Sequence, residues 1–182
     1  MRIVALLLLL LATPTLAEDA SAWRILTQPG AVGLMRHAEA PGTRDPEGFR
    51  LEDCASQRQL DDAGRAQARA MGEAVRRHGI PVARVYSSQW CRCRETAELL
   101  GLGRVDLLPA LNSLRWDQAD PPAQLAETRR IISGASGQAV LMVTHQFNIT
   151  ELTGESAASG EIIVVRAAMN GSLTVLGRVS PP

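Results

Sequence analysis

The stretch AVGLMRHAEA, residues 31–40, is the part of the chain that best indicates the fold. Its first five residues are apolar and follow a proline and a glycine, which predicts a short buried strand over 31–36 rather than a helix. The strand stops at Arg36 and His37, and only three histidines occur in the chain. Such a pair is either a solvated strand end or part of an anion site. The second interpretation requires other polar or basic residues at the ends of neighbouring strands.

Two further apolar runs stop at polar residues in the same way. ARVYSS ends at Ser88, and AVLMVT ends at Thr144 with His145 next to it. In an open parallel sheet, ligands collect beyond the carboxyl ends of the strands. Arg92 lies four residues after Ser88, in the first turn of a predicted helix, where free N–H groups also favour an anion. The sequence therefore predicts a phosphate-binding constellation.

The predicted elements alternate between strands and helices. Helices are expected over 21–28, 61–78, 90–100 and 122–133, and a third strand-like run over 105–111. Two C-terminal strands flank Asn170 and Gly171, a strong hairpin signal. This order predicts an α/β, three-layer sandwich with a mostly parallel sheet, helices on both faces and an antiparallel C-terminal hairpin.

The N-terminus, MRIVALLLLLLATPTLA, predicts a signal peptide over 1–17 that is cleaved after Ala17. Its apolar core is shorter than the roughly 20 residues that a membrane span needs, and no second such stretch follows. We therefore expect no stable membrane insertion and a single domain over 18–182, exported to a bacterial periplasm.

Charge and cysteine content narrow the possibilities further. Nineteen basic residues, all arginine, balance nineteen acidic ones, so nothing suggests a nucleic-acid partner. The cysteines are Cys54, Cys91 and Cys93, and in an oxidising compartment we expect one disulfide, joining Cys54 to either of the other two. A C-x-C metal site is the alternative, but no suitably spaced Cys or His pair completes it, so no metal is predicted.

Four motifs together resemble a known family. They are LMRHAE at 34–39, LDDAGRAQA at 60–68, SSQWCRCRETA at 87–97 and VTHQ at 143–146. In this order they are similar to the histidine phosphatase superfamily, which has the phosphoglycerate-mutase-like fold, over about 31–152. The family motif at the first strand is Arg-His-Gly, and Ala38 replaces the glycine here.

The resemblance implies a phosphomonoesterase that needs neither cofactor nor metal, and the N-terminal sequence predicts that it is exported. His37 would attack phosphorus and form a phosphohistidine, for which a neutral imidazole is required. Arg36 and Arg92 would bind the phosphoryl oxygens, and His145 would donate to them as a second imidazole.

The proton donor is the weak point of the resemblance. Many family members carry a glutamate just after the third strand, but Ser113 stands at that place. Asp117 and Asp120 are the candidates for the general acid, with Glu39 and Glu151 less favoured. A missing acid would favour good leaving groups, such as phosphorylated histidine or an acyl phosphate.

Several loop residues are candidates for reading the substrate: Arg44, with Arg50 and Arg58 near it, and the strand-end residues Asn112 and Asn148. The expected partner is a phosphorylated small molecule or an envelope sugar such as a lipopolysaccharide heptose. A protein that binds a phosphorylated ligand without turnover is the alternative. The sequence does not indicate the natural substrate or the oligomeric state.

Overall fold

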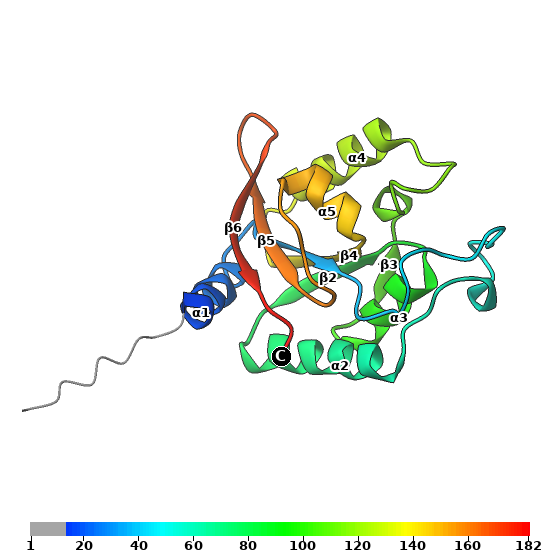
Figure 1. Ribbon diagram of the computed structural model, residues 1–182. Helices are drawn as coiled ribbons and strands as arrows, with labels where there is room; N and C mark the ends of the chain where they lie inside the picture. Colours follow the sequence, from blue (N-terminus) through cyan, green and yellow to red (C-terminus); the bar gives the residue numbers. More distant parts are fainter. Residues whose placement is uncertain (1–13) are drawn as a thin grey trace, which may run out of the picture.

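The computed structural model describes residues 14–182 and has one six-stranded sheet (Figure 1). The predicted signal peptide lies largely outside these residues. The strand order is β3-β2-β4-β1-β5-β6, with parallel pairing from β3 to β1 and antiparallel pairing of β5 and β6. The strands are β1 (Val32–Arg36), β2 (Val82–Ser87), β3 (Val105–Leu107), β4 (Ala139–Thr144), β5 (Ile162–Ala167) and β6 (Leu173–Val179).

Within residues 14–182, five α-helices cover the two faces of the sheet, which confirms the three-layer α/β prediction (Figure 1). On one face, α1 (Pro14–Leu26), α2 (Asp62–Arg77) and α3 (Cys91–Leu99) share a core with the sheet. On the other face, α4 (Pro121–Ser133) and α5 (Gln146–Thr153) form a second core. None of the helices between residues 14 and 182 is both long and apolar enough to cross a membrane.

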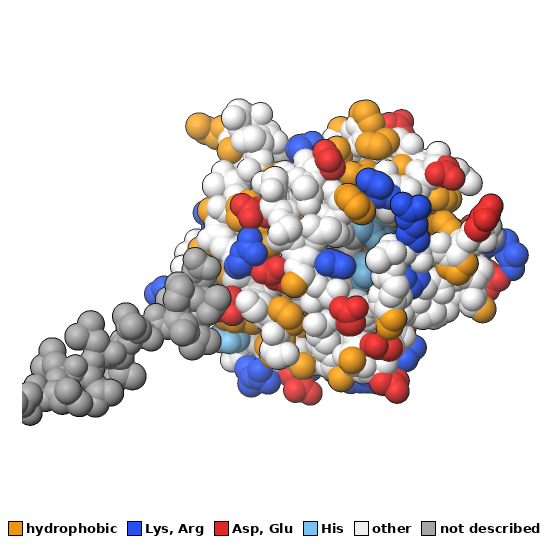
Figure 2. All heavy atoms as spheres, in the orientation of Figure 1, with side chains coloured by type: hydrophobic (Ala, Val, Ile, Leu, Met, Phe, Trp, Pro, Cys, Tyr) orange, Lys and Arg blue, Asp and Glu red, His pale blue; other side chains and the backbone are white. Residues whose placement is uncertain are grey.

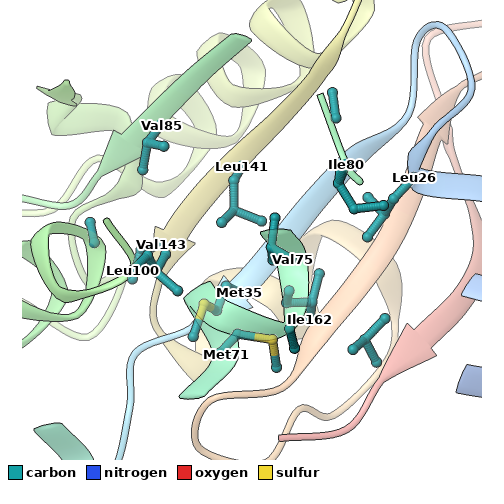
Figure 3. Close-up of a cluster of buried hydrophobic side chains, with 14 of the residues drawn as sticks. Leu26, Met35, Met71, Val75, Ile80, Val85, Leu100, Leu141, Val143 and Ile162 are labelled. Atoms are coloured by element: carbon teal, nitrogen blue, oxygen red, sulfur yellow. The ribbon is translucent and has the colours of Figure 1, made fainter. Parts of the chain in front are cut away.

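The cores form because the central strands are apolar on both sides. In β1, Leu34 packs toward α4 and α5, while Met35 packs toward α2. Acidic and basic side chains are intermixed over the surface in Figure 2. Figure 3 shows Met35, Met71 and Ile162 close together between the sheet and α2.

Two elements differ from the sequence prediction. The third strand is only three residues long, because Pro109, which has no N–H to donate, begins a 3₁₀ turn (Pro109–Leu111). Helix α5 was not predicted, since its eight residues include threonine and asparagine, which have low helix propensity. It matters for the site because it begins directly after His145.

Glycine lets α2 approach the segment that follows β1. A Cβ at Gly64 would lie 2.0 Å from the backbone oxygen of Glu39, so only glycine fits there. Asp61 caps the helix by accepting a hydrogen bond from the Gly64 N–H at 2.7 Å. The motif LDDAG therefore fixes the helix beside the chain that leaves His37.

Candidate active site

The three polar strand ends meet at one edge of the sheet, as predicted. The His37 N–H donates to the Thr144 carbonyl at 3.0 Å, and the Ser88 N–H donates to the Val143 carbonyl at 3.0 Å. The ring centroids of His37 and His145 are 5.7 Å apart. Both imidazoles are almost fully buried, with 3% and 4% of their residue surface exposed.

The surroundings of His37 leave one ring nitrogen available as a nucleophile. Its Nδ1 lies 2.8 Å from the Ala38 carbonyl, so Nδ1 carries the hydrogen and Nε2 keeps the lone pair. Burial, and then the charge of Arg92, lower the pKa of His37 to about 3, with Arg58 and Arg36 adding to the effect. The imidazole is therefore neutral at physiological pH, as a nucleophile must be.

Arg92 joins the parts of the site. Its Nε donates to His37 Nε2 at 3.2 Å, its Nη1 to Asp45 Oδ1 at 2.8 Å, and its Nη2 lies 3.4 Å from His145 Nδ1. Asp45 also accepts from the Trp90 indole N–H and the Arg58 backbone N–H, both at 3.0 Å. These three donors fix the position of the carboxylate, which in turn positions Arg92. Asp45 was not predicted as a site residue, because it comes from a loop whose sequence has little periodicity.

His145 is held on its far side by a hydroxyl. The Ser88 Oγ lies 3.0 Å from His145 Nε2 and 3.3 Å from Asn112 Oδ1. Asn112 Oδ1 can only accept, so the Ser88 hydroxyl donates to it and accepts from His145 Nε2, which leaves His145 Nδ1 as an acceptor toward Arg92. The pKa of His145 lies well below its usual value. Burial is the largest cause, and the charge of Arg92 is the next.

Arg36 and Arg58 add positive charge at the same place. The buried Nε atoms of both side chains have no hydrogen-bond partner among the described residues, although buried donors are normally paired. Both arginines line the pocket that contains His37. Two free guanidinium donors beside two neutral imidazoles favour an anionic ligand.

These residues lie in a cavity of about 820 Å³. We define its floor as Arg36, His37, Arg92 and His145, and its rim as Arg44, Phe49, Arg115, Trp116, Asp117 and Phe147. Figure 2 shows histidine side chains in a hollow with basic side chains around it. The rim comes from the loop after β1, the loop before α4 and the first turn of α5 (Figure 1).

The predicted loop residues divide into two groups. Arg44 and Asp117 line the pocket, and both are exposed. Asp120 does not line it and instead caps α4, accepting from the Ala123 N–H at 3.2 Å. Its candidacy as the general acid was therefore wrong.

The asparagines predicted to read the substrate hold the backbone instead. Asn112 accepts from the Gln89 N–H at 2.9 Å, and Asn148 donates to the Asn112 carbonyl at 2.8 Å. Neither lines the pocket. That prediction was wrong, because buried amides next to strand ends satisfy backbone groups before they reach a ligand.

The cysteine alternatives are resolved. Cys54 and Cys91 form the disulfide, with their Cα atoms 5.6 Å apart, and Cys93 is a free buried thiol. Burial raises the pKa of Cys93 to about 12, so it is inert as a nucleophile. The disulfide ties the loop that carries Asp45 to the start of α3, which carries Arg92.

Between residues 14 and 182, no three His, Cys, Asp or Glu side chains come together in a way that could hold a metal ion. The positive charge of the floor is supplied by arginine.

The comparison with protein families identifies the chain. A model described as histidine phosphatase superfamily (branch 1) matches residues 32–120, which contain His37 and Arg92. The chain belongs to the histidine phosphatase superfamily. His145 lies beyond the matched residues, and the fold brings it to the same floor.

Solved structures share the fold of this chain at low identity. The protein histidine phosphatase SixA complexed with tungstate is 21% identical, with a TM-score of 0.62, over 83% of this chain and 97% of that chain. A phosphoserine phosphatase variant from Entamoeba histolytica in complex with phosphoserine is 12% identical, with a TM-score of 0.59, over 82% and 96%. Among curated proteins, none matches the chain.

Proposed function

We propose that the protein is a phosphomonoesterase in which His37 carries the phosphoryl group between substrate and water. The observation that carries this proposal is the floor itself, where a neutral imidazole with an unprotonated Nε2 faces three arginines. Family membership and the phosphatase folds of its neighbours support the same reaction.

Two displacements complete the reaction. His37 Nε2 attacks phosphorus, an N–P bond forms, and the P–O or P–N bond to the leaving group breaks with its electron pair. Water then attacks phosphorus, and the N–P bond breaks to release inorganic phosphate. Substrate must displace the hydrogen bond between Arg92 and His37. The guanidinium groups of Arg36, Arg58 and Arg92 then bind the phosphoryl oxygens and stabilise their negative charge.

His145 is the second imidazole of the proposal. Ser88 donates its hydroxyl hydrogen to Asn112 and so accepts from His145 Nε2. His145 Nδ1 faces the phosphoryl group and can donate to it once it is protonated. A bound phosphate dianion also offsets the arginine charges that lower the pKa of His145, which favours a donor there.

Asp117 is the remaining candidate for the general acid, because it lines the pocket and Asp120 does not. If Asp117 is the acid, Asp117→Asn should slow hydrolysis of alkyl phosphates by about 10²-fold and leave aryl phosphates nearly unchanged. If the substitution changed the rate of both substrate classes by the same factor, Asp117 would be removed from the mechanism.

We also propose that the protein is exported. The N-terminal sequence supports this, and so does the Cys54–Cys91 disulfide, because disulfides persist mainly in oxidising compartments. N-terminal sequencing of the protein recovered from a periplasmic extract should begin near Glu18. Recovery of the uncleaved chain from the cytoplasm would contradict export.

The deciding experiment uses a phosphatase panel, including a heptose phosphate, on residues 18–182 with and without chelator. Turnover should survive chelation and disappear in His37→Ala, while His78→Ala, outside the pocket, should keep it. The second candidate, a protein that binds a phosphorylated ligand without turnover, is favoured by Ser113 at the expected acid position. Phosphate binding without turnover on any substrate, even an activated one, would select that candidate.

A further inference from the structure

The pocket holds most of the aromatic residues of this chain. Only six Phe, Trp and Tyr residues occur in 182. Four of them line the one cavity that contains His37: Phe49, Trp90, Trp116 and Phe147. Trp90 belongs to the buried core and Phe49 and Trp116 pack against that core. All three, with Phe147, also line a site whose floor is strongly basic. A phosphate ion alone would need none of them.

Three of these rings form a continuous wall that starts at the second histidine. Trp90 packs edge-on against His145, with ring centroids 5.3 Å apart, and against Trp116 at 5.2 Å. Phe49 lies 5.6 Å from Trp90 on the loop after β1. The wall therefore runs from the phosphoryl-binding floor to the rim, along the path that a leaving group would take.

Phe147 extends the rim on the α5 side. It lies two residues after His145, and 46% of its surface is exposed, which is unusual for a large apolar side chain. The Arg115 guanidinium lies 4.4 Å from its ring centroid. This cation–π contact holds the ring at the mouth of the cavity and adds a positive charge there.

The leaving-group chemistry agrees with an aromatic ligand. Ser113 stands where the acid was expected, Asp120 caps a helix, and Asp45 is held by Arg92 and Trp90. Asp117 is exposed at the rim and has to serve as the donor alone. A phenol, or an imidazole whose other ring nitrogen is already protonated, departs far more readily than a sugar or alkyl alcohol, so weak acid assistance costs such substrates little.

We propose that the aromatic wall and Phe147 form a leaving-group subsite, and that the preferred substrates are phosphates carried on an aryl or heteroaryl ring. This proposal rests on the proposed phosphatase function and specifies the substrate class of that site. The ring stacks on Trp116 and Phe147 while its phosphoryl group lies on the floor.

The test compares phenyl phosphate with naphthyl phosphate, whose leaving groups have similar acidity but differ in stacking area. The wild type should favour the naphthyl ester in kcat/KM by about tenfold. Phe147→Leu and Trp116→Leu should each lower this ratio toward one. Met169→Leu, at an exposed apolar residue outside the pocket, should keep it.

A matched binding experiment separates this proposal from the phosphatase function, because it needs no turnover. Naphthylmethylphosphonate should bind more tightly than benzylphosphonate to the wild type, and Phe147→Leu should remove the difference. Selective binding without any hydrolysis would support the proposed leaving-group subsite and contradict the proposed phosphatase function. A naphthyl-to-phenyl ratio near one in both assays, or faster hydrolysis of a heptose phosphate than of phenyl phosphate, would overturn the subsite.

Discussion

The floor and the rim of the pocket are built from different parts of the fold. The floor residues follow strands β1 and β4 or lie in the first turn of α3, and the buried ones are fixed by hydrogen bonds to one another. The rim residues Arg44, Arg115 and Asp117 are exposed and come from loops.

The difference indicates a division of labour. Strand ends in a packed sheet can hold reacting atoms in place, whereas loops vary with little cost to the core. We therefore assign the phosphoryl chemistry to the floor and the choice of substrate to the rim. Changes in the floor should affect every substrate, and changes in the rim should affect some substrates more than others.

Removing Arg92 should have the largest effect. Arg92→Ala is expected to lower kcat/KM by about 10³-fold for all substrates, because the guanidinium both binds the phosphoryl group and steadies two imidazoles. Arg44→Ala at the rim should cost less than about tenfold. A comparison of both variants on aryl and alkyl phosphates checks this.

A control is needed because Arg92→Ala leaves the Asp45 carboxylate buried without its partner. The double variant Arg92→Ala/Asp45→Asn removes both charges and should fold better than the single variant while staying inactive. Recovery of activity in the double variant would show that Arg92 acts only by neutralising Asp45.

Breaking the disulfide tests how the rim is attached. Cys54→Ser/Cys91→Ser opens a link across 37 residues and should lower the free energy of unfolding by about 4 kcal/mol. Denaturant unfolding of the two proteins measures this loss, with Cys93→Ser as the control for a cysteine outside the disulfide. A loss below about 1 kcal/mol would mean that the loop is held mainly by Arg58 and Asp45.

The burial of neutral His37 predicts a dependence of stability on pH. The unfolded chain binds a proton with a pKa of about 6.5, whereas folded His37 stays neutral down to about pH 3. Because the unfolded state binds more protons in this window, the free energy of unfolding should fall as pH drops below about 6.5. Between pH 7 and pH 5 His37 alone accounts for about 2 kcal/mol.

Denaturant titrations at the two pH values measure this effect. His37→Gln should reduce the dependence and leave the share of His145, whose pKa is also lowered by burial. His78→Gln, at an exposed position outside the pocket, should leave the dependence unchanged. Identical slopes for wild type and His37→Gln would contradict a buried neutral imidazole.

The smallest effect is expected at the two loop aspartates. Asp120→Ala removes the N-cap of α4 and should cost about 1 kcal/mol of stability without changing turnover. Asp117→Ala, which removes no helix cap, should leave stability unchanged. Thermal unfolding of both variants measures these losses of stability. A larger loss in Asp117→Ala than in Asp120→Ala would contradict the assignment of Asp120 as the structural residue.

The sequence predicted the floor better than the rim, for a physical reason. Short apolar runs that stop at Arg36, Ser88 and His145 mark strand ends, and neighbouring parallel strands bring those ends together. The LDDAG motif likewise predicted a helix start that the structure confirms at Asp61.

Loop geometry carries no such rule. Asp45 and Trp116 line the same pocket as Phe147 of α5 only after their loops are folded. Asp117 and Asp120 look alike in sequence, although Asp117 lines the pocket and Asp120 caps a helix. The wrong predictions for Asn112, Asn148 and Asp120 all concern polar residues near strand or helix ends, where backbone groups compete for them.

The central claim is that the phosphoryl group passes through His37, and the stereochemistry at phosphorus tests it most directly. An aryl phosphate made chiral with oxygen isotopes can transfer its phosphoryl group to an acceptor alcohol that replaces water. Two in-line displacements, first at His37 and then at the acceptor, predict retention of configuration in the product. Inversion would mean a single direct displacement and would contradict a phosphohistidine intermediate.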